Sequence, residues 1–233
     1  MPRFLAALVL GLVVSSANAD FPLEYDRAVS EPTRIQLESD LENYFSMRGA
    51  NPSPLFREIF GSFDRRASAR WFFSRVRFVG ENLCMDESAV ACVLSAWDNW
   101  IFLSPNYTRY DHPRVARLMV LFHEARHTER ENRFWPHARC PKNFTDEKGR
   151  PVRSIWTGAE LAGESACDLE TFGSYGVSAI LLLNIAYRCD NCSAEDRREA
   201  EIYGLDQLRR ITWKPARERI VNDLELSRSL LGR

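Results

Sequence analysis

The chain has 233 residues, of which 45% are hydrophobic and 27% are charged, a composition typical of a soluble protein with one hydrophobic core. Acidic and basic residues nearly balance, and a net charge of -1 excludes a strong electrostatic attraction to nucleic acid or to an anionic membrane as the basis of function.

The N-terminal segment, residues 1–19, has the features of a cleaved signal peptide. Arg3 precedes an apolar run over residues 4–14, and Ala17-Asn18-Ala19 matches the small-residue pattern at which signal peptidase cuts. The run is shorter than the roughly 20 apolar residues that a membrane-spanning helix needs, so we expect no stable anchor after cleavage. The sequence therefore predicts a secreted or periplasmic protein, cleaved after Ala19, in which residues 20–233 form a single domain.

Residues 20–62 are expected to be helical. Glu31 and Pro32 open one helix, and a shorter helix ends at Phe60 after a break at residues 51–54. The apolar stripe of the first helix, at helical spacing, consists of Leu37, Leu41, Tyr44 and Phe45.

Strands are expected next. Aromatic and β-branched residues are concentrated in residues 71–79, 89–97 and 100–103. Asp98 and Asn99, between the last two runs, have the composition of a two-residue turn. We therefore expect an antiparallel hairpin.

The rest of the chain is expected to be mostly helical. Asp111 is a plausible N-cap for a helix with Pro113 in its first turn, and prolines and glycines make residues 131–156 an irregular loop of the kind that often lines a cleft. Thr157 and Glu160 match a capping box that would open another helix. A buried helix over 177–187 and two surface helices after residue 193 follow. The fold class is thus α+β, with a small antiparallel sheet in a core over 63–190 and additional helices over 20–62 and 193–233.

All six cysteines lie in the part of the chain that would be exported, where an even number indicates disulfides. A redox pair or half of a zinc knuckle is the alternative for Cys189 and Cys192, but this pair follows a long apolar helix instead of opening a helix after a strand. Favouring local closure, we predict the pairs Cys84–Cys92, Cys140–Cys167 and Cys189–Cys192.

The motif that carries chemistry is His123-Glu124-Ala125-Arg126-His127, an HExxH sequence on a predicted helix. Positions i and i+4 share a helix face, so His123 and His127 can bind one zinc ion. Glu124 lies about 100° around the helix, where it can take a proton from water at the metal. Two surface histidines beside a salt-bridging glutamate are the alternative reading.

A catalytic zinc site normally has three protein ligands, so a third is required. The metzincin position, six residues after His127, holds Arg133 and excludes that class. Glu164, Asp168, His137 and Glu160 remain as candidates, although Glu160 is expected to be occupied in the capping box. His137 is read either as a functional residue, as a donor to the oxyanion before a third ligand, or as a loop residue near solvent. A bridge between Cys140 and Cys167 would bring its loop beside Glu164 and Asp168.

Together, His123-Glu124-x-x-His127 and Glu164-x-x-x-Asp168 resemble the HExxH and ExxxD motifs of the thermolysin-like gluzincins, which are zincin metallopeptidases. The resemblance extends over about residues 89–175. It implies that Glu164, on a second helix, is the third zinc ligand and that Asp168 orients a zinc-bound histidine. It also implies that residues 100–103 form the edge strand that aligns extended substrates. The donor to the oxyanion is not identified by the motifs, and His137 or Tyr175 could supply it.

These features predict an exported metallopeptidase with one zinc ion, acting on a peptide or protein and not on nucleic acid. Zinc would lower the pKa of its water towards 7, and Glu124 would act as general base. The alternatives are an amidase acting on cell-wall amide bonds, a catalytically inactive zinc-binding module, and a disulfide-stabilised structural protein without metal. A binding module has no need of Glu124, which favours the enzyme.

Overall fold

The computed structural model describes residues 22–225 except 86–88, 110 and 147, so the predicted signal peptide and its cleavage site lie outside the described residues. The described chain is α+β, with eight α-helices and a four-stranded mixed sheet. In chain order the elements are β1 (Glu24–Tyr25), α1 (Glu31–Ser46), α2 (Pro54–Phe60), α3 (Arg65–Phe73), β2 (Phe78–Glu81), β3 (Ala91–Cys92), β4 (Trp100–Leu103), α4 (Asn106–Arg109), α5 (Arg114–His127), the 3-10 helix η1 (Arg130–Asn132), α6 (Ser174–Arg188), α7 (Ala194–Arg209) and α8 (Lys214–Asp223).

The N-terminal helices begin where local chemistry favours them. The side chain of Ser30 accepts a hydrogen bond from the backbone N–H of Thr33 and caps α1, and Ser53 caps α2 in the same way; each helix also has proline in its first turn. The four predicted stripe residues of α1 are all buried. Both predicted helices are therefore confirmed.

The sheet differs from the predicted antiparallel hairpin. Its strand order is β1-β2-β4-β3, in which β1 and β4 each pair with β2 in parallel and only β3 and β4 are antiparallel. Residues 93–99 connect β3 and β4, so Asp98 and Asn99 do not form a two-residue turn. The predicted strand at 71–79 was wrong in its first part, because Trp71 to Phe73 end α3. Strand β4 lies inside the sheet, whose edge strands are β1 and β3, which corrects the expectation for residues 100–103.

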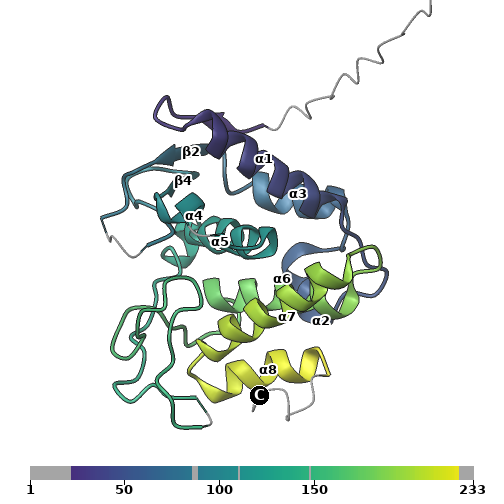
Figure 1. Cartoon of the computed structure of the whole chain (residues 1–233). Helices are drawn as coiled ribbons and strands as arrows, with labels where there is room; N and C mark the ends of the chain where they lie inside the picture. The colour runs from purple at the N-terminus through teal and green to yellow at the C-terminus, as the bar shows by residue number, and fades with distance from the viewer. Residues whose placement is uncertain (1–21, 86–88, 110, 147, 226–233) are drawn as a thin grey trace, which may run out of the picture.

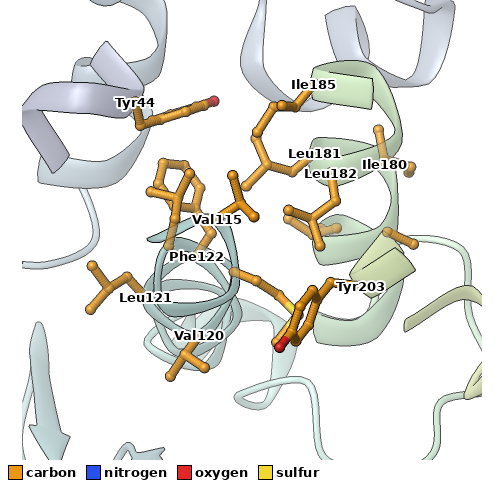
Figure 2. Close-up of a cluster of buried hydrophobic side chains, with 14 of the residues drawn as sticks. Tyr44, Val115, Val120, Leu121, Phe122, Ile180, Leu181, Leu182, Ile185 and Tyr203 are labelled. Carbon is orange, nitrogen blue, oxygen red and sulfur yellow. The ribbon is translucent and has the colours of Figure 1, made fainter. Parts of the chain in front are cut away.

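Helix α5 occupies the centre of the molecule, with α1, α3 and the sheet on one side and α6 and α7 on the other (Figure 1). Its N-cap is Pro113 and no side chain caps it, so the predicted cap at Asp111 was wrong. Its apolar residues point to both sides of the helix in the core, where Phe122 faces Tyr44 of α1 (Figure 2). The Phe122 ring also contacts Trp71 and Phe72 at 5.3 and 5.2 Å between centroids. This packing fixes the rotation of α5, and hence the direction of His123 beside Phe122.

No helix forms over residues 157–173, which corrects the predicted capping box and second helix. Gly158 and Gly163 have φ angles of 74° and 80°, a conformation that interrupts a right-handed helix. Glu160 pairs with Arg153 across an isolated β-bridge and is not a helix cap. The segment forms a loop that packs against residues of the segment 140–152. Together they form a small buried cluster, separate from the main core, made of Cys140, Phe144, Val152, Leu161 and Cys167.

The C-terminal part is helical as predicted. Helix α6 is buried along nearly its whole length, whereas α7, opened by a capping box of Ser193 and Asp196, packs on it with one face. The three predicted cysteine pairs all lie at disulfide-bonding distance. Among the described residues, no helix combines the length and the apolar character that crossing a membrane requires.

Candidate metal centre

The last turn of α5 presents two histidines toward one point. His123 and His127 are four residues apart on the helix, and their Nε2 atoms lie 3.2 Å from one another. The HExxH spacing therefore places two imidazoles on one face of α5, as predicted.

The third histidine comes from the irregular loop. The Nε2 atom of His137 lies 3.1 Å from Nε2 of both His123 and His127. Among the described residues, these three form the one group of His, Cys, Asp or Glu side chains close enough together to hold a metal ion. Glu164, the third ligand implied by the gluzincin resemblance, is not a member of this group. The helix that was to carry Glu164 does not form, and its exposed side chain lies in the wall of the cleft described below.

Hydrogen bonds on the far side of two rings set which nitrogen faces the centre. Nδ1 of His127 lies 2.7 Å from the carbonyl oxygen of Phe134, and Nδ1 of His137 lies 2.9 Å from the Asp168 carboxylate. Both oxygens only accept, so in each neutral ring Nδ1 carries the hydrogen and Nε2 keeps a lone pair. Two lone pairs thus face each other at 3.1 Å, an arrangement that a cation between them would stabilise.

The protonation states favour a metal ion as that cation. Burial, together with the neighbouring His127 and His137, holds the pKa of His123 well below its usual 6.5, and burial lowers the pKa of His127 to about 4. Both rings are therefore neutral at pH 7. Zinc with Zn–N bonds of 2.0–2.1 Å and tetrahedral geometry places its ligand nitrogens about 3.3 Å apart, close to the spacing found here. A donor set of three imidazoles fits zinc.

Asp168 is positioned to orient His137. Its side chain is 4% exposed, accepts from Nδ1 of His137 through Oδ1, and accepts from the backbone N–H of Tyr175 through Oδ2 at 2.9 Å. A Cβ added to Gly173 would lie 2.3 Å from that same Oδ2 atom, so only glycine leaves room for the carboxylate. The sequence motif thus identified a carboxylate that contacts a histidine of the group, although that histidine is His137.

The loop that carries His137 is held by a buried carboxylate that the sequence analysis missed. Glu129, 5% exposed, accepts hydrogen bonds from Arg75, Arg126, Asn132 and Trp135. This charge-assisted cluster fixes both ends of the turn between η1 and the loop. No spacing rule identifies Glu129, because its partners come from the segment after α3, from α5, from η1 and from the loop.

The turn itself is strained. Three consecutive residues other than glycine, Arg133, Phe134 and Trp135, have φ angles of 54°, 64° and 46°. Each such residue costs roughly 1 kcal/mol or more, so the surrounding structure must hold the turn in place. The turn places the Phe134 carbonyl against His127 and leads directly to His137. Backbone strain is therefore located where it aligns two members of the histidine group.

Beside the histidines, the Cys140–Cys167 disulfide joins the two halves of the loop. Ala138 and Cys167 also exchange two backbone hydrogen bonds, of 2.7 and 3.1 Å. His137 is the residue before Ala138 and Asp168 is the residue after Cys167, so both adjoin this backbone-paired Ala138–Cys167 bridge. The disulfide therefore keeps the histidine and its carboxylate partner in register.

A cleft of about 670 Å³ opens onto the centre. Glu124 lies in its wall with 7% of its surface exposed, and burial raises the pKa of its carboxyl group to about 8. Residues 89–91, which lead into the edge strand β3, form part of the same wall. The cleft therefore brings together two histidines of the group, His123 and His137, with a carboxyl group and a strand edge.

Tyr175 lines the cleft next to the histidines. Its ring centroid lies 4.7 Å from that of His123 and 4.6 Å from that of His137, and its hydroxyl accepts a hydrogen bond from Nη1 of Arg210 at 3.1 Å. Burial raises the pKa of Tyr175, so its hydroxyl keeps its proton and can donate it. The sequence analysis named Tyr175 but missed Arg210, which looks like an ordinary charged residue at a helix end.

Comparisons with known proteins give no relative: no protein-family model matches the chain, and no significant match was found among curated proteins or solved structures. The function must therefore be argued from the geometry of the site.

Proposed function

We propose that this chain is an exported zinc-dependent hydrolase that cleaves peptide bonds. The observation that carries the proposal is the convergence of three imidazole nitrogens, 3.1–3.2 Å apart, at the end of a cleft that also holds a buried glutamate. Three protein ligands and an open side are the usual arrangement of catalytic zinc. In this proposal His123, His127 and His137 are the ligands, and Asp168 orients His137.

Bound zinc would lower the pKa of a water molecule towards 7 and polarise the substrate carbonyl. Glu124 would act as the general base that accepts a proton from the attacking water, and it would return this proton to the leaving amine. The raised pKa of Glu124 suits a group that must both accept and release a proton near neutral pH. Tyr175, whose oxygen already accepts from Arg210, donates its hydrogen to the carbonyl oxygen as negative charge develops there.

The shape of the cleft favours a peptide among the possible amide substrates. Strand β3 has β4 as its one partner in the described sheet, and the residues that lead into it line the cleft. An extended peptide can add to such an edge through main-chain hydrogen bonds. The three disulfide pairs are compatible with export.

The test is Glu124→Gln in the zinc-loaded, disulfide-intact protein, assayed on a degenerate peptide library by mass spectrometry. We expect the variant to keep one zinc per chain and to lose about 10²- to 10⁴-fold in kcat, the range that general acid–base groups supply. Glu170→Gln, an exposed glutamate outside the cleft, is the control and should retain full activity. Full activity of Glu124→Gln would end the assignment of the base, and no cleavage by the zinc-loaded wild type would end the assignment as a peptidase.

A further inference from the structure

The C-terminal end of α7 places a polar cluster in the wall of the cleft, beyond the groups used above. Gln207 and Arg210, three residues apart in the chain, both line the cleft. Their exposed fractions are 2% and 7%, and Asp206 between them is 6% exposed. Side-chain polar atoms buried to this degree normally have at least one hydrogen-bond partner.

One atom of the cluster is an exception. The Oε1 atom of Gln207 is buried and has no hydrogen-bond partner. Rotating the amide would not help, because its Nε2 atom donates to Oδ2 of Asp206 at 3.0 Å, and a rotated amide would bring two acceptor oxygens together. Asp206 thus fixes the orientation of Gln207, with an acceptor left over.

Arg210 offers the complementary group. Its Nε donates to Asp206 at 3.1 Å and its Nη1 to Tyr175 at 3.1 Å, whereas Nη2 makes no hydrogen bond to any described residue. The Asp206 carboxylate neutralises the guanidinium charge within the cluster. At the wall of the cleft, the cluster therefore contains one acceptor and one donor that no described residue satisfies, and it carries no net charge.

We propose that Gln207 and Arg210 bind a main-chain amide of the substrate next to the scissile bond. The Oε1 atom of Gln207 accepts from the amide N–H, and Arg210 donates to a carbonyl oxygen. A substrate carboxylate fits less well, because it would meet the unpaired acceptor of Gln207 and find the charge of Arg210 already balanced. This inference rests on the proposed function, since it assigns the substrate contacts of the same cleft.

The experiment uses the best peptide from the library, synthesised as a series in which each amide near the cleaved bond is methylated on nitrogen in turn. In the wild type, methylation of one non-scissile amide is expected to lower kcat/KM at least tenfold. In Gln207→Met, which keeps the length of the side chain but removes the acceptor, the unmethylated peptide should lose a similar factor. Methylation at that one position should then have no further effect, whereas every other position behaves as in the wild type.

Gln36→Met is the matched control, because Gln36 also donates its amide to an aspartate, Asp40 of α1, but lies outside the cleft. Zinc content and the thermal midpoint are measured for each variant, and Gln207→Ser replaces Gln207→Met should the latter not fold. Equal sensitivity to methylation in wild type and variant overturns the inference, as does a wild type that tolerates methylation at every position. Absence of any cleavage by the wild type is a different result, which rejects the proposed function and the inference with it.

Discussion

Replacing His137 by alanine tests which residue is the third zinc ligand: His137, as in the histidine group, or Glu164, as the gluzincin resemblance implies. Disturbing a group that merely orients a ligand costs about 10- to 100-fold in metal affinity, so removing a ligand should cost at least about 100-fold, or about 2.8 kcal/mol. The His137 side chain is 19% exposed on a loop, so its loss should change the stability of the metal-free protein little.

Zinc affinity is measured by competition with a chromogenic chelator, and the thermal midpoint of the metal-free protein is measured alongside. Glu164→Gln is the matched control. Because Glu164 is exposed and lies outside the histidine group, zinc affinity should stay within about threefold of the wild type. Retained affinity in His137→Ala together with a large loss in Glu164→Gln would refute the reasoning and restore Glu164 as the third ligand.

Three further substitutions test the supports of the site and of the fold. Glu129→Gln breaks a buried ionic cluster and should cost about 3 kcal/mol of unfolding free energy and about tenfold in zinc affinity; an unchanged affinity would show that the cluster does not position the loop. Gly173→Ala should push the Asp168 carboxylate away and lower zinc affinity about 10- to 100-fold, as measured by the same competition, and a crystal structure with Asp168 unmoved would contradict this. Burial raises the pKa of Asp196, but hydrogen bonds from Arg114 and Ser193 outweigh it and hold the pKa below its usual value. The stability from this group is therefore complete above the unfolded pKa of about 3.9 and is lost as the pH falls through the folded pKa, so Asp196→Asn should flatten the decline in unfolding free energy below about pH 4. Unfolding free energy is measured by urea titration at several pH values, and an identical pH dependence below about pH 4 in the two proteins would contradict the assignment.

The parts of the fold that depend on neighbours in the chain were predictable. The helix with the HExxH motif follows from the apolar stripe of residues 115–125, and α1 and α2 follow from their serine caps and prolines. The pairs Cys84–Cys92 and Cys189–Cys192 follow from local closure, and Cys140–Cys167, with a sequence separation of 27, is the pair that remains. The histidine spacing then placed His123 and His127 on one face without any tertiary information.

The third member of the histidine group, His137, is placed by contacts between distant segments of the chain. Residues 157–168 contain the pattern of a helix, but two glycines with positive φ and the bridge to Cys140 make the segment a loop. His137 reaches the centre through a strained turn that Glu129 holds together with Arg75, which follows α3, and Arg126 of α5. Spacing rules do not describe such a turn. The resemblance therefore favoured Glu164, although the sequence had already marked His137 as a candidate.

X-ray absorption of the zinc-loaded, disulfide-intact protein tests the central claim most directly. We predict one zinc per chain, with Zn–N distances of about 2.0–2.1 Å and an outer-shell signal of three imidazoles that falls to two in His137→Ala. A protein that takes up no stoichiometric zinc, or a signal of two imidazoles that does not change in His137→Ala, would contradict the account.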